Sequence, residues 1–160
     1  MSPPSIHIVE NVIRAIVGRT LEALPHETGG ALVGWREGAA VIVMDFIEIS
    51  SGKPLRARYD LGIADLNSAL ADYLSSATDA RMGYVGSWHS HPAAVGPSFI
   101  DRCTFRKTSR AHANPLAFVV AATDGRSTGL HLTWAGRRGG RYRLVEQETI
   151  TRGGDDRGQR

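Results

Sequence analysis

The sequence has little cysteine and no long hydrophobic run. Its 160 residues include a single cysteine, Cys103, which cannot form an internal disulfide. The longest apolar run, AAVIVM, has the length of a strand and is far too short to cross a bilayer. The chain does not open with a basic segment followed by an apolar one, so no secretory signal is expected. These absences predict a cytoplasmic protein in a reducing compartment, with no membrane association.

Aromatic residues are scarce and the net charge is small. Phe, Trp and Tyr make up 7% of the chain, and the net charge is +3. Much of the positive excess lies in residues 135–145 (AGRRGGRYRLV) and in the C-terminal tail, without interleaved aromatic residues on which bases could stack. We therefore predict no nucleic-acid partner and interpret these arginines as a solvated surface that could steer an acidic protein.

What remains is the composition of one ordinary globular domain. Hydrophobic residues account for 42% of the chain and charged residues for 22%, and no internal repeat or linker divides it. A chain of this length can bury a core without disulfides. We predict a single domain over residues 1–150, followed by a flexible tail over residues 151–160 (TRGGDDRGQR).

Hydrophobic periodicity predicts a mixed α/β fold. Alternation and short apolar runs predict strands at residues 5–9, 29–37, 39–50, 81–91, 115–123, 129–136 and 141–148. Helical spacing predicts helices over residues 10–24 and 65–74 and from residue 98 onward. Pro25 should stop the first helix, and Asp65 should cap the second. Residues 52–62 are expected to be irregular or briefly extended.

The stretch HSHPAAVGPSFID, residues 89–101, combines groups that bind metals. His89 and His91 stand two residues apart, so in a strand both imidazoles project to one side. Ser98 and Asp101 begin the next helix, and its first turn could aim the Asp101 carboxylate at the same point. Two histidines and one carboxylate leave the fourth position of a tetrahedral zinc site open to water, as in catalytic sites. A simpler interpretation is also open, in which a strand leads to a helix that Ser98 and Asp101 merely cap.

A zinc hydrolase also needs a base that does not bind the metal. Glu27, in HETGGALVGW, precedes a Gly-Gly pair that opens a predicted strand, so it could overhang a site at the strand end. Taken alone, Glu27 is more typical of an exposed acidic residue that follows a helix.

Glu27, the HSHP segment and the Ser98-x-x-Asp101 pair together resemble the JAMM motif of the MPN (JAB) metalloprotease family, in which a glutamate precedes H-x-H-P and S-x-x-D. The resemblance implies an α/β domain with a mixed, curved sheet flanked by helices, similar to the cytidine deaminase architecture. It implies that His89, His91 and Asp101 bind one Zn²⁺ ion with a catalytic water. It also implies that Glu27 acts as general base and acid, and that Ser98 stabilises the oxyanion of the tetrahedral intermediate.

The resemblance also implies a function. Better-known members of this family are zinc isopeptidases that remove ubiquitin or ubiquitin-like proteins from conjugates. The expected reaction is hydrolysis after the C-terminal glycine of a ubiquitin-like protein, by deconjugation or by precursor processing. The expected partners are that protein or its conjugates and, in a bacterial antiphage system, activating and conjugating enzymes encoded nearby. The loop between His91 and Ser98 is shorter than is common in the family, so its shape and substrate contacts are expected to differ.

Three alternatives can be weighed from the residues. Zinc nucleobase deaminases need a P-C-x-x-C pair, which a single cysteine cannot supply. Cys103 could serve as a nucleophile with a histidine as base, but it is expected to be a small buried residue on the helix of Asp101. A non-catalytic MPN-type scaffold that binds a partner is the third alternative, and the complete motif argues against it.

The remaining histidines match no metal or catalytic pattern. They are interpreted as surface or packing residues: His7, His26, His112 and His131. Trp35 and Trp88 are expected in the core, where Trp88 could also shape the site beside the two histidines.

Overall fold

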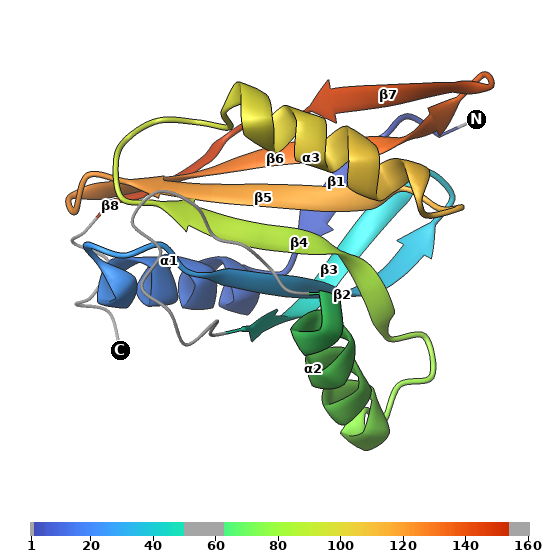
Figure 1. The fold of residues 1–160 in the computed structure, drawn as a ribbon, viewed down its shortest axis with the longest axis horizontal. Coiled ribbons are helices and arrows are strands. Elements are labelled where there is room, and N and C mark those ends of the chain that lie inside the picture. The colour runs from blue at the N-terminus through green and yellow to red at the C-terminus, as the bar shows by residue number, and fades with distance from the viewer. Residues whose placement is uncertain (1, 50–62, 154–160) are drawn as a thin grey trace.

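The computed structural model of the protein describes residues 2–49 and 63–153. These residues form eight strands and three helices (Figure 1). The strands are β1 (Ser5–Ile8), β2 (Gly29–Glu37), β3 (Ala40–Glu48), β4 (Gly83–His91), β5 (Leu116–Thr123), β6 (Ser127–Arg138), β7 (Arg141–Glu146) and β8 (Ile150–Gly153). The helices are α1 (Glu10–Ala23), α2 (Ile63–Ser76) and α3 (Phe99–Arg110).

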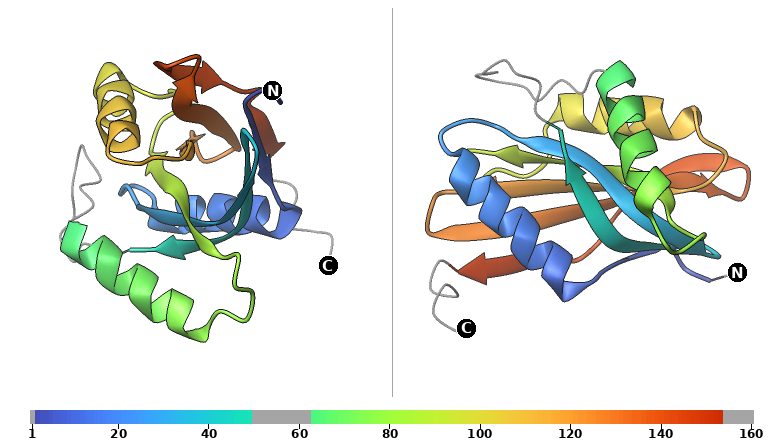
Figure 2. Two further views of the ribbon diagram at one scale, coloured as in Figure 1. Left: turned by 90° about the vertical axis from the view of Figure 1, so that its right-hand side faces the viewer. Right: turned by 90° about the horizontal axis from the view of Figure 1, so that it is seen from below.

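All eight strands belong to one mixed sheet in the order β1-β3-β2-β4-β5-β6-β7, with β8 paired to β6. β1 runs parallel to β3 and β4 runs parallel to β5, whereas the other pairs are antiparallel. The two turned views show that the sheet is strongly curled (Figure 2). The prediction of a single α/β domain with a mixed, curved sheet flanked by helices is confirmed.

β5 forms the centre of the fold, because all of its residues are buried. Its odd-numbered apolar side chains pack with Ile16 of α1 in one cluster. Its even-numbered apolar side chains pack with Phe105 of α3 in a second cluster. α1 and α3 therefore cover opposite faces of the sheet (Figure 1). A strand buried on both faces reads as a continuous apolar run, as LAFVVAAT does.

α1 follows its prediction closely. Val12, Ile13 and Ile16 are buried, at the spacing of one helical face. The helix ends at Ala23, and Pro25 follows two residues later, where its missing N–H cannot continue the helical hydrogen bonds. The chain then leaves the helix and continues through the residues that precede β2.

α2 differs from its prediction at both ends. It begins at Ile63, so Asp65 lies in the first turn, where the helix dipole favours an acidic residue, instead of capping the helix. It also includes Ser75 and Ser76, whose hydroxyls donate to backbone carbonyls three residues earlier and so extend the last turn. The predicted irregular segment at residues 52–62 lies outside the described residues. Within the described ranges, no helix is both long and apolar enough to span a bilayer.

Residues 151–153 correct the predicted C-terminal tail, because they belong to β8. β7 pairs only with residues 133–138 of β6, so the backbone groups on that edge of residues 127–132 of β6 are left without a partner from β7. β8 fills this edge in antiparallel register, with Thr151 opposite Gly129. This pairing satisfies backbone groups of a strand more than twenty residues upstream, which local sequence does not reveal. Residues 154–160 lie outside the described residues.

Two predictions about burial are wrong. Cys103 is exposed, because α3 turns Phe105 toward the sheet and a residue two positions away points about 200° around the helix. Trp35 is only half-buried, and the Arg81 guanidinium lies over its ring at 3.8 Å. Trp88 is fully buried, as predicted.

Phe105 should be the residue that holds α3, and with it Asp101, on the sheet. Its ring stacks on Phe118 of β5, with 4.3 Å between the centroids. Phe105→Ala should lower the free energy of unfolding by about 3–5 kcal/mol, because it leaves a cavity between helix and sheet. Urea unfolding measures this change, and Cys103→Ala on the exposed side of the same helix should alter stability by no more than about 0.5 kcal/mol. Equal effects of the two substitutions would show that this contact does not hold the helix.

Candidate metal centre

β4 presents both histidines on the α3 side of the sheet. Along the end of the strand, Trp88 and Ser90 are buried, whereas the alternating His89 and His91 are half-buried. His89 pairs with Val120, a residue of the cluster that packs under α3. The two imidazole centroids are 5.0 Å apart. The prediction that both imidazoles project to one side is confirmed.

The first turn of α3 orients the Asp101 carboxylate. Ser98 is the N-cap, and its Oγ accepts a hydrogen bond from the Asp101 backbone N–H at 3.1 Å. In return, Asp101 Oδ2 accepts a hydrogen bond from the Ser98 backbone N–H at 2.8 Å. This reciprocal pair is a capping box, in which the side chain of the third helical residue reaches back to the N-cap. The simpler interpretation of the motif, a capped helix, is therefore correct but incomplete.

The two histidines and Asp101 converge on one point. His89 Nε2 lies 3.2 Å from His91 Nε2 and 3.2 Å from Asp101 Oδ1. His91 Nε2 lies 3.3 Å from Asp101 Oδ2. Ligand atoms of a tetrahedral zinc ion stand about 3.4 Å apart, given bonds of about 2.1 Å, so this donor set fits zinc in chemistry and in spacing. The three side chains are 14–18% exposed, so the cluster is partly accessible to solvent.

Charge as well as hydrogen bonding holds this cluster together. Burial alone would raise the pKa of the Asp101 carboxyl, but hydrogen bonds from His89, His91 and the Ser98 N–H hold it well below its usual range. The hydrogen bond to Asp101 raises the pKa of His91 against the opposing effect of burial, with further contributions from a backbone carbonyl and a nearby glutamate. A proton on His91 therefore competes with a metal ion for the same nitrogen.

The other nitrogen of His91 is held by the loop that follows β4. His91 Nδ1 lies 3.1 Å from the carbonyl oxygen of Val95. A carbonyl can only accept, so Nδ1 carries a hydrogen. In the neutral imidazole Nε2 therefore keeps the lone pair that a metal needs, whereas in the protonated imidazole Nε2 donates to Asp101. The loop 92–97 therefore selects the tautomer in which His91 could bind a metal at Nε2.

The residues that precede β2 bring Glu27 to the same edge of the sheet. The Thr28 carbonyl accepts the Ser90 N–H at 2.8 Å, and the Thr28 N–H donates to the buried Ser90 hydroxyl at 2.9 Å. Extending this antiparallel pairing by one residue puts Glu27 opposite His91. Glu27 is half-buried there, and it is close enough for its charge to act on the His91 imidazole.

Gly29 allows β2 to approach β4 closely enough for this arrangement. A Cβ at position 29 would lie 2.4 Å from the Trp88 carbonyl oxygen and 3.0 Å from His89 Cα. Real Cβ atoms do not come that close to backbone, so a larger residue would push β2 away from the strand that carries the histidines. The Gly-Gly that follows Glu27 in the sequence thus has a steric role in the site.

Three contributions to this region were not predicted: the Ser90 hydroxyl, the Val95 carbonyl and the His131 ring. Ser90 and Val95 act through contacts with backbone groups, which patterns of residue type do not show. His131 lies on β6, where burial lowers its pKa and the positive charge of a protonated His91 lowers it further. The sequence places it only as a surface or packing residue, because its position beside the site depends on the order of the strands.

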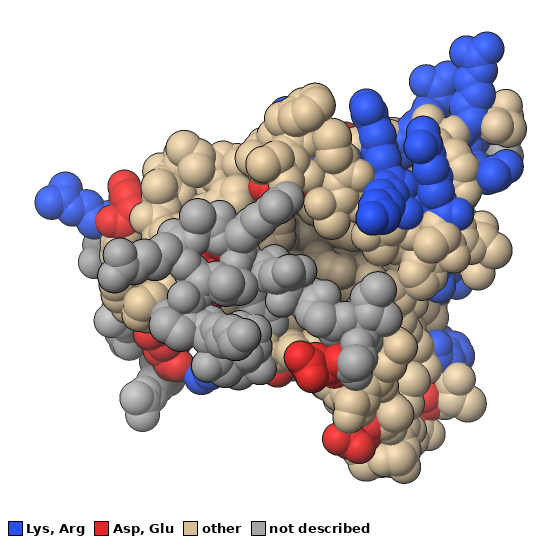
Figure 3. Space-filling model, in the orientation of Figure 1, with Lys and Arg blue, Asp and Glu red and all other residues tan. Residues whose placement is uncertain are grey.

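The basic residues gather away from this cluster. Figure 3 shows Lys and Arg side chains over the C-terminal end of α3 and the β6–β7 hairpin, whereas Asp101 is at the start of α3. Arg110 and Arg137 lie over the Tyr142 ring, 5.7 and 4.5 Å from its centroid. Cations therefore cover this aromatic ring, which is not presented as a stacking surface.

Residues 9–134 match the family described as prokaryotic homologs of the JAB domain. The chain belongs to this family. The matched range contains Glu27, both histidines, Ser98 and Asp101, so the whole motif lies inside the JAB domain.

One curated protein and two solved structures are also similar to this chain. A curated relative of this chain, from Vibrio cholerae, is named CD-NTase/cGAS isopeptidase and is 30% identical over 115 residues, which cover 71% of this chain and 73% of the relative. A solution structure from Desulfitobacterium hafniense has a TM-score of 0.65 at 18% identity, covering 89% of this chain and 90% of that one, and shows the same fold. A JAB1/MPN domain protein from Archaeoglobus fulgidus matches with a TM-score of 0.43 at 17% identity, covering 74% of this chain and 80% of that one.

Removal of one donor should abolish tight metal binding. His91→Ala or Asp101→Asn should weaken zinc affinity by more than roughly 100-fold, since loss of partners outside the coordination shell already costs up to that amount. Competition with a chromophoric chelator measures the affinity. His112→Ala is the matched control, because this exposed histidine packs against Tyr84, outside the cluster, and its loss should leave zinc affinity unchanged.

Zinc affinity should also fall at acidic pH. The pKa of His91 is raised above its ordinary value of 6.5, so protonation competes with the metal at a higher pH than for a free histidine. Affinity should be highest above the raised pKa and should decrease as the pH falls through it. Chelator competition between about pH 8 and about pH 5.5 follows this decrease. An affinity that stays constant down to the lower end of this range would contradict binding through His91.

Proposed function

We propose that this JAB domain is a zinc-dependent isopeptidase that hydrolyses the bond after the C-terminal glycine of a ubiquitin-like protein. The observation that carries the proposal is the convergence of two imidazole nitrogens and the Asp101 carboxylate at tetrahedral spacing, with Glu27 at the same edge of the sheet. Three protein donors leave one position for the reaction, which is typical of catalytic rather than structural zinc sites.

The relative from Vibrio cholerae supports this activity through its name, CD-NTase/cGAS isopeptidase. An isopeptidase cleaves an amide that joins a carboxyl terminus to a lysine side chain. We infer that the substrate is a conjugate of this type, or a precursor in which the same glycine is followed by further residues. Activating and conjugating enzymes encoded nearby would then form the bond that this protein breaks.

The side chains of the site divide the chemistry between them. A bound zinc ion supplies Lewis acidity, which polarises the scissile carbonyl and lowers the pKa of the attacking water. Glu27 takes one proton from that water while the oxygen of the water bonds to the carbonyl carbon. When the C–N bond breaks, Glu27 donates the proton to the leaving nitrogen. The products are a carboxyl group on the ubiquitin-like protein and a free amine on its former partner.

Ser98 can serve the helix and the reaction at once. Its Oγ uses a lone pair to accept the Asp101 N–H, so its hydroxyl hydrogen stays free to donate. The side chain is exposed and lies beside the metal cluster. It is therefore the residue that we assign to the oxyanion of the tetrahedral intermediate.

Glu27→Gln should abolish cleavage and leave zinc affinity and the free energy of unfolding unchanged, because Glu27 carries a proton but does not hold the metal. Loss of a general base typically reduces the rate by about 10²–10⁴-fold. The assay uses a small β-grasp protein encoded beside the gene, with a second protein fused after its terminal glycine. Glu37→Gln at the far end of β2 is the matched control and should cleave like the wild type.

Two outcomes of this assay would overturn the proposal. If the wild type cleaves no such fusion or conjugate and Glu27→Gln behaves identically, the protein is a non-catalytic MPN-type scaffold. If Cys103→Ala loses activity while a chelator has no effect, the protein is a thiol enzyme. Cys103 follows Asp101 by two residues on α3, so its side chain points about 200° around the helix from the carboxylate, which argues against that second outcome.

A further inference from the structure

The loop that carries the Val95 carbonyl rests on a histidine of another strand. Pro92 to Val95 are exposed, whereas Gly96 and Pro97 are half-buried. A Cβ added to Gly96 would lie 3.2 Å from both Cε1 and Nδ1 of the His131 ring. The backbone of Gly96 therefore lies against this imidazole, and a Cβ at this position would require the loop or the ring to shift by a few tenths of an ångström.

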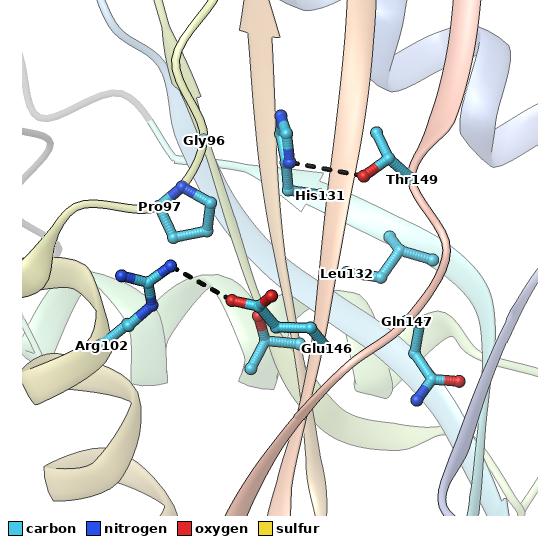
Figure 4. Close-up of a pocket in the computed structure, with 9 residues that line it drawn as sticks. Gly96, Pro97, Arg102, His131, Leu132, Glu146, Gln147 and Thr149 are labelled. Carbon is cyan, nitrogen blue, oxygen red and sulfur yellow. Dashed lines mark hydrogen bonds and ion pairs between the residues drawn. The ribbon is translucent and has the colours of Figure 1, made fainter.

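The His131 ring is itself supported from the other side. Its Nδ1 lies 3.5 Å from the Thr149 hydroxyl, and the ring lines a pocket of about 270 Å³ between the loop, α3, β6 and β7 (Figure 4). Because His131 is on β6, two strands away from β4, its position is fixed by the sheet and not by the loop. The loop therefore packs against a ring that is held by the sheet and by Thr149. We call this ring the seat of the loop.

This contact leads to the metal cluster through one peptide unit. The carbonyl of Val95 and the nitrogen of Gly96 belong to the same planar group, so a displacement of Gly96 moves the Val95 oxygen with it. That oxygen holds His91 Nδ1 at 3.1 Å. His131 therefore contacts Gly96, Gly96 shares its peptide with Val95, and Val95 fixes the imidazole whose Nε2 faces Asp101.

We propose that His131 is a positioning residue for the metal centre, which seats the Val95–Gly96 peptide and so fixes the orientation and tautomer of His91. The proposal rests on the metal site of the proposed function and not on the identity of its substrate. The short loop 92–97 has few residues that could contact one another and fix its shape. In this proposal its contact with His131 on the sheet fixes that shape instead.

Metal binding tests this role without any substrate. Gly96→Ala places a Cβ 3.2 Å from the ring, so the loop or the ring must shift by a few tenths of an ångström, and His131→Ala removes the ring. Each should weaken zinc affinity by about 10-fold, which is the lower range for loss of a group that orients a ligand histidine. The double variant should lose less than the product of the two single effects, because both act on one contact. His131→Phe keeps a flat ring under Gly96 and should restore most of the affinity.

A spectrum separates this role from a general loss of stability. With cobalt in place of zinc, the visible absorption bands of Gly96→Ala and His131→Ala should shift, since they depend on ligand geometry, whereas those of His131→Phe should match the wild type. Gly83→Ala at the start of β4 is the control, because a Cβ there meets nothing within 4 Å. Gly96→Ala alters only the loop side of the contact, so it remains informative if His131→Ala unfolds.

The results that would overturn the inference differ from those that would overturn the proposed function. Wild-type zinc affinity and an unchanged cobalt spectrum in Gly96→Ala would show that the seat does not act on His91, even if Glu27→Gln abolishes cleavage. Independent, multiplicative effects of the two substitutions would also contradict it, because they would not share a contact. A wild-type protein that binds no zinc would refute both this inference and the metal site on which it rests.

Discussion

The reciprocal hydrogen bonds between Ser98 and Asp101 are the interaction on which the site depends. They begin α3, and a cap of this kind contributes about 1 kcal/mol to helix stability. They also remove most of the freedom of the Asp101 carboxylate, which then stands within 3.3 Å of both histidine nitrogens. A flexible carboxylate would lose conformational entropy on meeting a metal ion, and here the fold has already restricted it. The same hydrogen bonds that begin the helix thus also orient the Asp101 carboxylate, the proposed metal ligand.

The curled sheet supplies the rest of the geometry. β4 ends in two imidazoles on the α3 face, and β2 runs antiparallel beside it, so the residue preceding β2 arrives where β4 ends. The Ser90 hydroxyl takes the place of a backbone partner for Thr28, and this closes the two strands at the point where Glu27 leaves the sheet. The proposed ligands and the proposed base therefore come from three segments that are held by backbone pairing and by one cap, whereas the loop 92–97 is held by neither.

The parts of this arrangement that could be predicted are those encoded by local spacing. The i, i+2 histidines, the Ser-x-x-Asp cap and the Pro25 that follows α1 each act within a few residues, and all three lie as predicted. The parts that could not be predicted depend on contacts between distant segments. β8 fills an edge of β6, Cys103 turns outward because Phe105 turns inward, and His131 reaches the loop only because of the strand order. The sequence contains these residues but no local pattern that pairs them.

The central claim is that His89, His91 and Asp101 hold one zinc ion that Glu27 faces without binding. The most direct test is a crystal structure of the zinc-loaded protein with anomalous diffraction recorded on both sides of the zinc absorption edge. We predict one anomalous peak about 2.0–2.2 Å from His89 Nε2, His91 Nε2 and an Asp101 oxygen, with the Glu27 carboxylate outside this range. A zinc peak elsewhere, or one in which Glu27 is a ligand in place of a histidine, would contradict the account.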